Sequence, residues 1–322
     1  MILLVGVSGE APLERIHKEL TERRQEVALL DQRHVLDYEI DVTFAREVTG
    51  EIRLGERVID LADITAVYWR PYSLEQIPAL SRQERNSRDW RHASGMTDIL
   101  CSWAELTRAL VINRLSSMAS NGSKPYQSLV IHACGFETPE TLITNDTDAL
   151  REFWLRHGTV IYKSISGVRS IVTRLGQQHV ERFPLLHWCP TQFQQYVPGA
   201  DYRVHVVDNE TFGTKIICDA DDYRYAARSG HEVRLEAWQV PEDVAQRCLS
   251  LTHTLGLHFA GIDLRFHPAG KWFCFEVNPS PAFTFYQDQT GQEISRAVAR
   301  LLIEGGAELA CLPARIDSPL VQ

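Results

Sequence analysis

The chain has 322 residues, of which 44% are hydrophobic and 23% charged, and its 42 acidic and 33 basic residues give a formal net charge of −9 at pH 7. This length suggests two domains or one large composite unit, which can bury a core without disulfides or metals. The acidic balance argues against nucleic-acid binding, which requires a basic excess, and no apolar run reaches the roughly 20 residues of a membrane helix.

The first residues and the cysteines together suggest a compartment. Met1 to Pro12 contain an apolar run without a basic segment before it, which favours a first strand over a signal peptide. The seven cysteines are scattered and form no CxxC pair, as is typical of reduced thiols in the cytoplasm. We therefore expect a cytoplasmic protein with no membrane or nucleic-acid partner.

The N-terminal segment has the pattern of a β-α-β unit. An apolar strand is expected at Ile2–Val7 and a second at Val27–Leu30, and Leu13, Ile16 and Leu20 recur between them at helical spacing. This order favours a parallel sheet. The Gly6–Gly9 stretch resembles part of a nucleotide loop, but it lacks the third glycine and is interpreted as a turn.

The next elements complete an N-terminal domain of about 112 residues. A hairpin is expected at 52–61 and a strand at Ala66–Trp69 that stops at Arg70-Pro71. The stretch from Leu74 to Ile112 has a mostly helical pattern. Its apolar stripe consists of Met96, Ile99, Leu100, Trp103, Leu106 and Leu110.

The sequence changes character at Asn113. A helix at Tyr126–Cys134 and strands near Val160 and Ile171 are expected first, and strands then alternate with helices up to a last apolar helix that begins near Ile294. The expected division is an N-terminal α/β domain (1–112), a middle lobe (113–190), a C-terminal lobe (191–310) and a tail (311–322).

The most informative feature is a predicted strand pair, 261–266 and 272–279, joined by a His-Pro-Ala-Gly turn. Side chains alternate between the two faces of a strand. Ile262, Leu264 and Phe266 should share one face, and so should Phe273, Phe275 and Val277 of the partner. If these apolar faces pack together, then the remaining polar side chains lie on one side. These are Asp263, Glu276 and Asn278.

Three oxygen donors without Cys or His suit a hard cation such as Mg²⁺ or Mn²⁺ and would not suit zinc. Two neighbouring carboxylates are also costly unless a cation neutralises them. The alternative at this point is a polar face exposed to solvent.

The segments Gly261-Ile262-Asp263-Leu264-Arg265 and Phe275-Glu276-Val277-Asn278-Pro279-Ser280-Pro281 resemble the metal-binding end of ATP-grasp enzymes. The pattern is most similar to RimK-type carboxylate–amine ligases, and among them to the maturases of graspetides such as the microviridins. The resemblance covers 113–302 well and the first 110 or so residues only loosely. It implies an ATP-grasp fold of mixed α/β and α+β class, with an N-terminal α/β (pre-ATP-grasp) domain, ATP between the middle and C-terminal lobes, and Asp263, Glu276 and Asn278 as ligands of Mg²⁺ or Mn²⁺.

The same resemblance assigns phosphate contacts to two lysines and a loop. Lys124 follows a serine-rich stretch, and Lys163 ends an apolar strand that leads into a loop containing Ser166 and Gly167. Backbone N–H groups and hydroxyls in such a loop can hold phosphates. A surface lysine and a plain hairpin turn are the alternatives.

Further contacts are implied around the segment that joins the two lobes. The backbone of Gln195, Tyr196 and Val197 would pair with adenine. Asp201 would lie near the ribose and Arg203 near the transferred phosphate, whereas an exposed Asp–Arg pair on an edge strand is the alternative. The maturases often carry a lysine where this chain has Lys215, and a triplet like Asp222-Tyr223-Arg224 with tryptophan in place of tyrosine. Arg224 is therefore a candidate for binding phosphate or a substrate carboxylate.

The implied reaction is ADP-forming ligation. A substrate carboxylate is activated as an acylphosphate and joined to an amine or hydroxyl, on a ribosomal peptide or on a free amino acid. A non-ligating ATP-grasp kinase and a nucleotide-binding module without activity are the alternatives. A homodimer is a further expectation of this reading.

Overall fold

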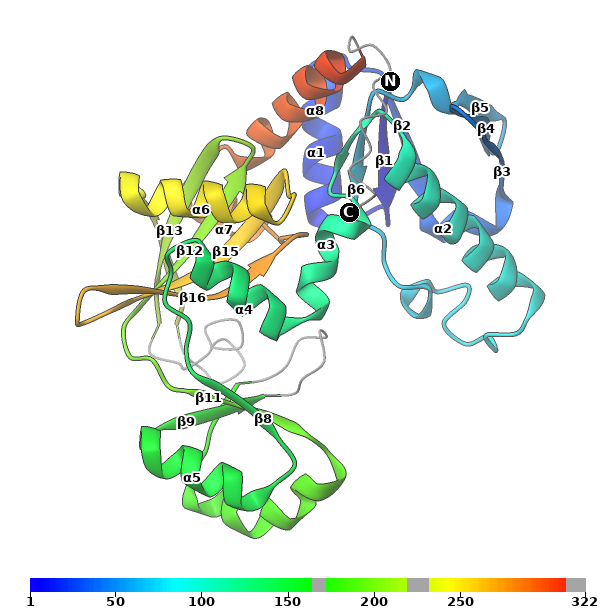
Figure 1. The fold of residues 1–322 in the computed structure, drawn as a ribbon. Helices are drawn as coiled ribbons and strands as arrows, with labels where there is room; N and C mark the ends of the chain where they lie inside the picture. Colours follow the sequence, from blue (N-terminus) through cyan, green and yellow to red (C-terminus); the bar gives the residue numbers. More distant parts are fainter. Residues whose placement is uncertain (164–171, 219–231, 311–322) are drawn as a thin grey trace.

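The computed structural model describes residues 1–163, 172–218 and 232–310, which form four β-sheets and their helices (Figure 1). An N-terminal domain lies on one side, a middle lobe at the far end of the molecule, and a C-terminal lobe between them (Figure 1). Residues 311–322, the expected tail, lie outside the described residues, and so do the strand position near Ile171 and the loop around Ser166.

The N-terminal domain is built on a parallel sheet of order β2-β1-β6-β7. Its expected β-α-β start is confirmed, because β1 is buried along its whole length and α1 buries the predicted apolar positions Leu13, Ile16 and Leu20. The elements are β1 (Ile2–Gly6), α1 (Ala11–Glu22), β2 (Val27–Asp31), β6 (Ala66–Trp69), α2 (Arg88–Leu106) and β7 (Leu110–Ile112), with 3₁₀ turns η1 (Gln32–Asp37), η2 (Leu61–Asp63) and η3 (Leu74–Gln76).

An antiparallel sheet adds to this domain. The expected hairpin at 52–61 is confirmed as β4 (Val48–Leu54) and β5 (Arg57–Asp60), and Gly55 at the turn has a positive φ of 64°. A strand that was not predicted, β3 (Tyr38–Phe44), pairs with β4 along its whole length.

The expectation of a mostly helical stretch from Leu74 to Ile112 is wrong at both ends. The helix α2 begins only at Arg88, where the Ser87 side chain caps it. Its chain becomes extended at Thr107, and β7 follows as a buried strand parallel to β6. Leu106 is consequently exposed rather than part of the buried stripe.

The middle lobe has an antiparallel sheet of order β10-β9-β11-β8, with α5 and η5 on its outer face (Figure 1). Its other face turns toward the C-terminal sheet (Figure 1). The elements are β8 (Thr141–Thr144), α5 (Thr147–His157), β9 (Val160–Lys163), β10 (Thr173–Arg174), η5 (Gln177–Trp188) and β11 (Thr191–Gln195).

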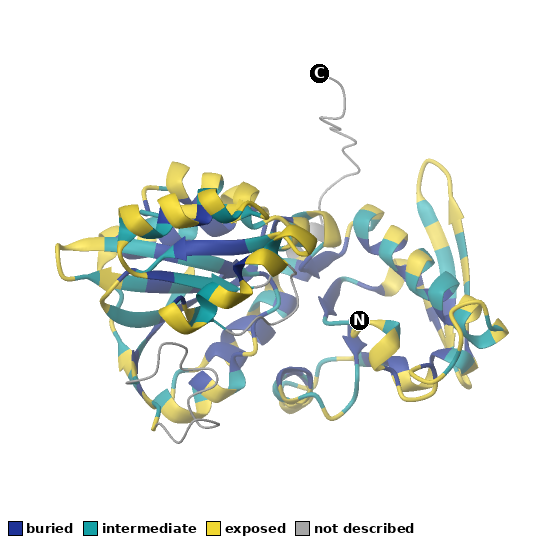
Figure 2. Cartoon of the chain, turned by 90° about the horizontal axis from the view of Figure 1, so that it is seen from below, coloured by how far each residue is buried: buried dark blue, intermediate teal, exposed yellow. Residues whose placement is uncertain are grey.

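The C-terminal lobe contains a five-stranded antiparallel sheet of order β14-β13-β12-β15-β16. One face of this sheet packs against α4 and α6, where Ile131 and Leu251 join the buried side chains of the strands. Buried residues are coloured dark blue in Figure 2. The elements are β12 (Ala200–Val207), β13 (Glu210–Ile217), β14 (Arg234–Trp238), α6 (Glu242–Thr254), β15 (Phe259–His267), β16 (Lys271–Asn278), α7 (Thr284–Thr290) and α8 (Ile294–Ala310).

Several elements pack across the expected domain boundaries. The segment after the N-terminal domain forms α3 (Leu115–Met118), η4 (Ala119–Gly122) and α4 (Lys124–Ala133), and α4 packs on β16 of the C-terminal lobe. The strand β11 pairs within the middle lobe. The last helix, α8, returns to α1 and buries Ile294, Val298 and Leu302 in the core beneath the N-terminal sheet. The N-terminal and C-terminal parts therefore share a hydrophobic core. None of the helices in the described ranges combines the length and the apolar character that a membrane span requires.

Candidate active site

The centre of the site is the β15–β16 pair. Asp263 lies directly opposite Glu276, and Gly261 lies opposite Asn278, with the buried pair Ile262 and Val277 between them on the other face. Directly opposed residues point to the same side of a sheet. Asp263, Glu276 and Asn278 therefore share one face, as the alternation predicted.

The predicted apolar face of β16, formed by Phe273, Phe275 and Val277, is wrong for both phenylalanines. The register shifts between Asp263 and Leu264, so that Leu264 pairs with Cys274 and not with Phe275. Cys274 and Val277 are the buried side chains of β16, and burial raises the pKa of the Cys274 thiol well above its ordinary value. Phe275 lies on the opposite face, with its ring 5.1 Å from the Arg265 guanidinium.

Two ion pairs of opposite polarity link β12 to β15 on this face. Arg203 Nη1 donates to Asp263 Oδ1 at 2.7 Å, and Arg265 Nε and Nη2 donate to the two carboxylate oxygens of Asp201 at 2.6 and 2.8 Å. Asp201 and Arg203 share a face, as predicted, but they are partners of Arg265 and Asp263 and not of each other. Both strands are interior to the sheet, so these pairs do not lie on an edge strand.

Gly261 makes room for the Arg203 guanidinium. A Cβ atom at position 261 would overlap Nη2 and Cζ of Arg203, whose side chain is only 5% exposed. The guanidinium also lies 5.8 Å from the ring centre of Tyr286. A glycine at this position therefore lets the Arg203 side chain lie flat on the sheet beside Asp263.

Lys124 compensates the second carboxylate. Its Nζ donates to Glu276 Oε1 at 2.6 Å and to Asn121 Oδ1 at 3.0 Å from the start of α4. The third donor of the face, Asn278, accepts a hydrogen bond on Oδ1 from the Ser280 backbone N–H at 2.9 Å. A carbonyl oxygen has a second lone pair, so this bond leaves Asn278 able to bind a cation as well.

These residues fit a divalent hard cation. Among the described residues, Arg203 contacts the carboxylate of Asp263 and Lys124 contacts that of Glu276, and the donor set consists of oxygens alone. Throughout the described ranges, no group of three or more His, Cys, Asp or Glu side chains is placed to hold a metal. A cation on this face would therefore take two carboxylates and an amide from the protein, and its other ligands from phosphate oxygens and water, as is usual for Mg²⁺.

His205 lies behind Arg203 on the same strand and is fully buried. Its ring packs 4.9 Å from Tyr286 and 6.4 Å from Phe259, and neither ring nitrogen has a hydrogen-bond partner among the described residues. Burial, and next the charge of Arg203, lower the pKa of His205 well below its ordinary value. The imidazole is therefore neutral in the folded protein.

We expect His205 to make the protein less stable in acid. Below its unfolded pKa of about 6.5 the unfolded chain binds a proton that the folded chain does not, so stability is full above that pH and falls by up to about 1.4 kcal/mol per pH unit below it. His205→Phe should make the unfolding free energy depend less steeply on pH between about 6.5 and 5. The decrease in slope should be up to about 1.4 kcal/mol per pH unit, which corresponds to one proton. Denaturant unfolding at several pH values measures this slope. The control His34→Phe, at an exposed histidine, should leave it unchanged. Equal slopes for wild type and His205→Phe would contradict this account.

The middle lobe supplies Lys163 from the face that turns toward the C-terminal lobe. Lys163 pairs with Gln192 in the register, whereas the neighbouring pair Tyr162 and Phe193 belongs to the core under α5 and η5. Lys163 therefore lies on the opposite face from that core, as its expected role requires. The side chain is the last described one before the loop.

The expected adenine segment connects the two lobes. Gln195 N–H donates to Glu140 O at 2.9 Å, and Tyr196 N–H donates to Thr159 O at 3.1 Å, so both amides are used within the middle lobe. The Val197 carbonyl accepts from Arg265 Nη1 at 2.8 Å. Arg265 thereby links the predicted adenine segment to Asp201, the residue that is predicted to lie near the ribose.

Of the remaining predicted site residues, only Lys215 lies in the described ranges, and it is not on this face. Lys215 lies opposite Tyr202 in the register, and Tyr202 packs with the core on the α4 and α6 side of the sheet. Lys215 therefore lies on the other face from Arg203 and Asp263. Ser166, Gly167 and Arg224 lie outside the described residues.

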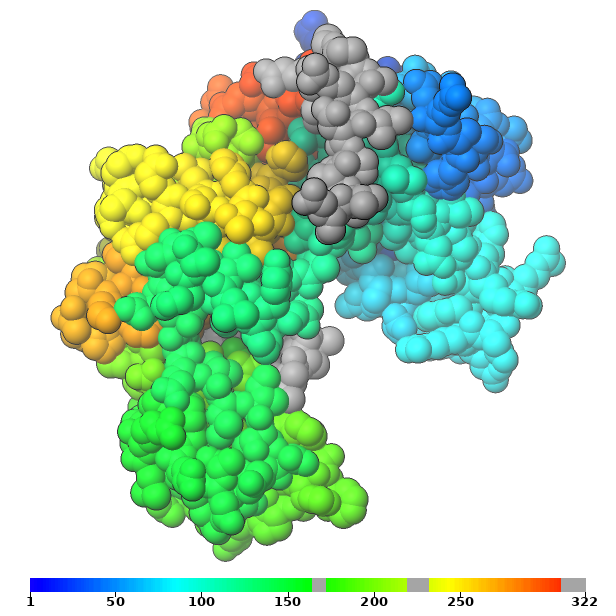
Figure 3. Space-filling model, viewed as in Figure 1, coloured from blue at the N-terminus to red at the C-terminus, as the bar shows by residue number. Residues whose placement is uncertain are grey.

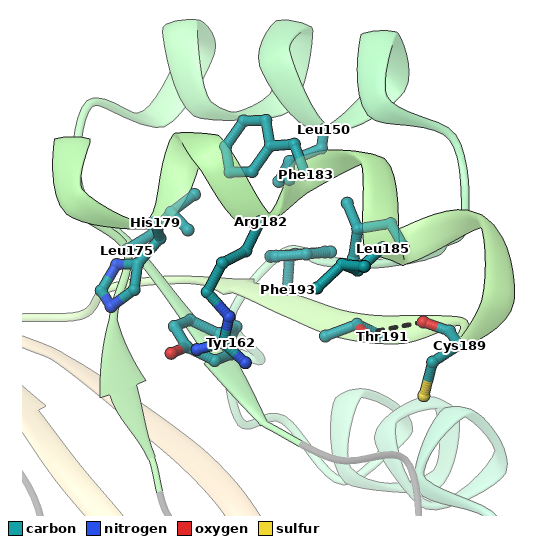
Figure 4. Close-up of a pocket in the computed structure, with 11 residues that line it drawn as sticks. Leu150, Tyr162, Leu175, His179, Arg182, Phe183, Leu185, Cys189, Thr191 and Phe193 are labelled. Carbon is teal, nitrogen blue, oxygen red and sulfur yellow. Dashed lines mark hydrogen bonds between the residues drawn. The ribbon is translucent and has the colours of Figure 1, made fainter.

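A cavity of about 210 Å³ lies elsewhere, inside the middle lobe (Figure 4). Tyr162 and Phe193 of the sheet line it together with His179, Arg182 and Phe183 of η5. Because Tyr162 and Lys163 are consecutive in β9, the cavity and Lys163 lie on opposite faces of the sheet. The cavity is therefore separate from the candidate active site.

A broader hollow lies on the surface between the middle lobe and the N-terminal domain (Figure 3).

Three polar side chains that sequence reasoning did not assign to the site hold the segment 277–281, which follows the acidic pair. Asn113 Nδ2 donates to Pro279 O at 2.6 Å and to Phe259 O at 2.7 Å. Gln127 exchanges two hydrogen bonds with the backbone of Val277, at 2.9 and 3.0 Å. Arg70 Nη1 donates to Ser280 Oγ and Pro281 O at 3.0 and 3.1 Å. The sequence signal for these residues is weak, because each lies more than 140 residues from its partner.

Comparison with known proteins gives a consistent picture. A glutathione synthetase of Thermosynechococcus vestitus is 23% identical over 218 residues, which span 63% of this chain and 65% of that protein. The ATP-grasp ligase PsnB, in a structure with a phosphomimetic variant of its minimal precursor, Mg and ADP, superimposes with a TM-score of 0.80 at 22% identity, over 95% of this chain and 98% of PsnB. The macrocyclase MdnC of Microcystis aeruginosa MRC, bound to the precursor peptide MdnA, gives a TM-score of 0.79 at 17% identity, over 94% and 99% of the two chains.

These similarities establish the fold, and a family model establishes the family. The structural likenesses, all below 25% identity, confirm the mixed α/β ATP-grasp architecture that the motifs implied. The model of the RimK-like ATP-grasp domain matches residues 121–302, which is more than half of the chain. The matched range contains Lys124, Arg203, Asp263, Glu276 and Asn278. The chain belongs to the RimK-like ATP-grasp family.

Proposed function

We propose that this protein is an ATP-dependent, ADP-forming ligase that uses ATP with Mg²⁺ or Mn²⁺. The observation that carries the proposal is the compensated acidic face, on which Arg203 and Lys124 each hold one carboxylate of the opposed pair Asp263 and Glu276. When a metal ion and phosphates bind, the metal ion can replace the two cationic side chains at the carboxylates. These side chains can then pair with the phosphates, so that no charge is left unpaired.

In this proposal Asp263, Glu276 and Asn278 hold the metal, and Lys124, Lys163 and Arg203 contact phosphates. A bound divalent cation would supply neutralisation of the negative charge on the phosphate oxygens. Arg203 would stabilise the charge that develops on the transferred phosphoryl group. Its guanidinium would do so from the space that Gly261 leaves open beside Asp263. The protein's contribution is positioning and charge, with no covalent catalysis.

The other assignments complete the nucleotide site. The backbone of Gln195, Tyr196 and Val197 would flank the adenine, with Asp201 near the ribose. Ser166 and Gly167 would contact the phosphates, and Arg224 would bind phosphate or the substrate carboxylate. Lys215 is the weakest of these assignments, because its register position is on the far face of the sheet.

The proposed reaction has two steps. A substrate carboxylate oxygen attacks the γ-phosphorus of ATP, the bond to the β–γ bridging oxygen breaks, and ADP leaves the acylphosphate behind. An amine or hydroxyl then attacks the acyl carbon, loses its proton and displaces inorganic phosphate. The product is an amide or an ester, and one ATP is consumed per bond formed.

We further propose a peptide as the substrate. Support comes from the structures that match this chain over nearly its whole length, since PsnB and MdnC were both observed with precursor peptides. A ligase for free amino acids or another small molecule is the second candidate, and the partial match to a glutathione synthetase favours it. A cytoplasmic setting is also proposed, because the seven cysteines are widely spaced along the sequence and form no CxxC pair. A homodimer stays a prediction.

The mass of the product tests this function. The protein is incubated with Mg-ATP and with short peptides encoded beside its gene, and in parallel with free amino acids. A peptide ligase that forms internal bonds removes one water, about 18 mass units, per bond and releases ADP and phosphate in equal amounts. An adduct between a peptide or amino acid and a second amino acid would keep ligation but would exclude macrocyclisation. A stable gain of phosphate would identify a kinase and contradict the proposal.

A further inference from the structure

Arg70 joins the N-terminal domain to the segment that carries Asn278. It directly follows β6, at the end of the parallel sheet where β1 leads into α1. Its side chain is 10% exposed. The guanidinium donates two hydrogen bonds to one carboxylate, from Nη2 to Glu10 Oε1 at 2.6 Å and from Nε to Glu10 Oε2 at 3.0 Å. Burial opposes the charge, but the neighbouring Tyr68 and Glu10 raise the pKa of Arg70, so it stays a cation.

The remaining nitrogen of Arg70 reaches across to the C-terminal lobe. Nη1 donates to Ser280 Oγ at 3.0 Å and to Pro281 O at 3.1 Å, more than 200 residues away in the sequence. The backbone N–H of the same Ser280 donates to Asn278 Oδ1 at 2.9 Å. Arg70 is therefore linked through a single residue to the oxygen that would bind the cation.

Glu10 in turn has a fixed position. Its carboxylate caps α1 by accepting from the Leu13 N–H at 3.2 Å, and it is only 12% exposed. The planar guanidinium is thus held on one side by two bonds to a carboxylate at the end of a helix. Such a fork allows little rotation, which makes Arg70 a rigid support and not a loose surface contact.

We propose that Arg70, braced by Glu10, is a positioning residue that sets the Asn278 oxygen for metal binding. The inference rests on the proposed function, because it requires a metal at Asp263, Glu276 and Asn278. Neighbours that orient metal ligands commonly change metal affinity by about 10- to 100-fold when they are removed. A role limited to holding the domains together would instead affect only stability.

The chain offers a matched control for that difference. Arg15 on α1 pairs with Asp288 on α7 at 2.8 Å, so it also joins the N-terminal domain to the C-terminal lobe. This pair belongs to the same interface as Arg70 but has no contact with Ser280 or Asn278 among its hydrogen bonds. Arg15→Gln therefore removes a link between the domains without disturbing the metal ligand.

The experiment measures Mn²⁺ binding to the full chain in the presence of ADP, by the electron paramagnetic resonance signal of free Mn²⁺. Arg70→Gln and Arg70→Lys should raise the Mn²⁺ dissociation constant by about tenfold or more. Neither side chain can donate two hydrogen bonds to Glu10 and a third to Ser280 at the same time, as the guanidinium does. Arg15→Gln should change it less than about twofold, within the small effects of exposed ion pairs. Thermal unfolding of each variant reports stability separately.

The outcomes separate the two proposals. If wild type binds no Mn²⁺ with ADP, the proposed function fails and this inference fails with it. If wild type binds Mn²⁺ and the Arg70 variants bind it equally well, the positioning role alone is overturned, whatever their melting temperatures. If Arg70→Gln does not fold, Arg70→Lys and Glu10→Gln decide on the same criterion. A loss of affinity in Arg15→Gln as large as in Arg70→Gln would also overturn the inference.

Discussion

Glu276→Gln is expected to reduce turnover by at least about 100-fold while the fold is kept. The substitution preserves the shape of the side chain but removes one of the two negative charges of the opposed pair, and it leaves Lys124 without the carboxylate that it contacts at 2.6 Å. Removing a single preorganised electrostatic contact in an active site commonly costs about 10²–10³ in rate. ADP release with the true substrate, measured at saturating Mg-ATP, gives the comparison.

A matched substitution shows whether the effect belongs to the site. Glu137 forms a second Lys–Glu pair of the same lobe, with Lys271 at the other end of β16 at 2.8 Å, and both side chains are largely exposed. Glu137→Gln should change the rate less than about twofold, because an exposed pair contributes little. If Glu276→Gln releases ADP at the wild-type rate, Asp263 and Glu276 are an ordinary solvent-exposed polar face.

Gly261→Ala should almost abolish activity although it adds only a methyl group. The new Cβ would occupy the position of the Arg203 guanidinium, so Arg203 must leave Asp263 or the strands must separate. Inserting a methyl group into a packed site costs about 1–3 kcal/mol of stability. The loss of turnover should approach that of Arg203→Ala.

A double-mutant cycle tests this mechanism directly. In an Arg203→Ala background the space above position 261 is open, so the stability cost of Gly261→Ala should largely disappear. The control is Gly95→Ala in α2, where an added Cβ meets no atom within 4 Å and alanine favours the helix. A stability cost of Gly261→Ala that is unchanged without the Arg203 side chain would refute the proposed role of the glycine.

The sequence predicted those parts of the site that depend on short-range alternation. The faces of β15 and β16 follow from period two, and the apolar stripe of α1 follows from helical spacing, because both patterns are local. The bulge in this strand pair has no such local signal. It places Cys274 instead of Phe275 opposite Leu264, so the apolar face of β16 was assigned to the wrong residues. Lys215 shows a similar limit, because its face is fixed only by its pairing with Tyr202.

Long-range contacts explain most of what was missed. Asn113, Gln127 and Arg70 were polar residues of no evident role, because their partners lie 150 to more than 200 residues away. The strand β7 was hidden in a stretch of helical pattern, because its three residues are too few to show alternation. The ion pairs of Arg203 and Arg265 likewise require the β12–β15 register, which no local pattern provides.

Thermal unfolding with and without Mg-ATP tests the central claim most directly. The account holds that Asp263, Glu276 and Asn278 bind a metal–ATP complex, and a ligand that binds only the folded state stabilises it by about 2.7 kcal/mol at 100 times its dissociation constant. Saturating Mg-ATP should therefore raise the melting temperature of wild type clearly, and ATP with a chelator should raise it less. The shift should also be smaller in Glu276→Gln. A melting temperature of the wild-type protein that is the same with and without saturating Mg-ATP would contradict the account.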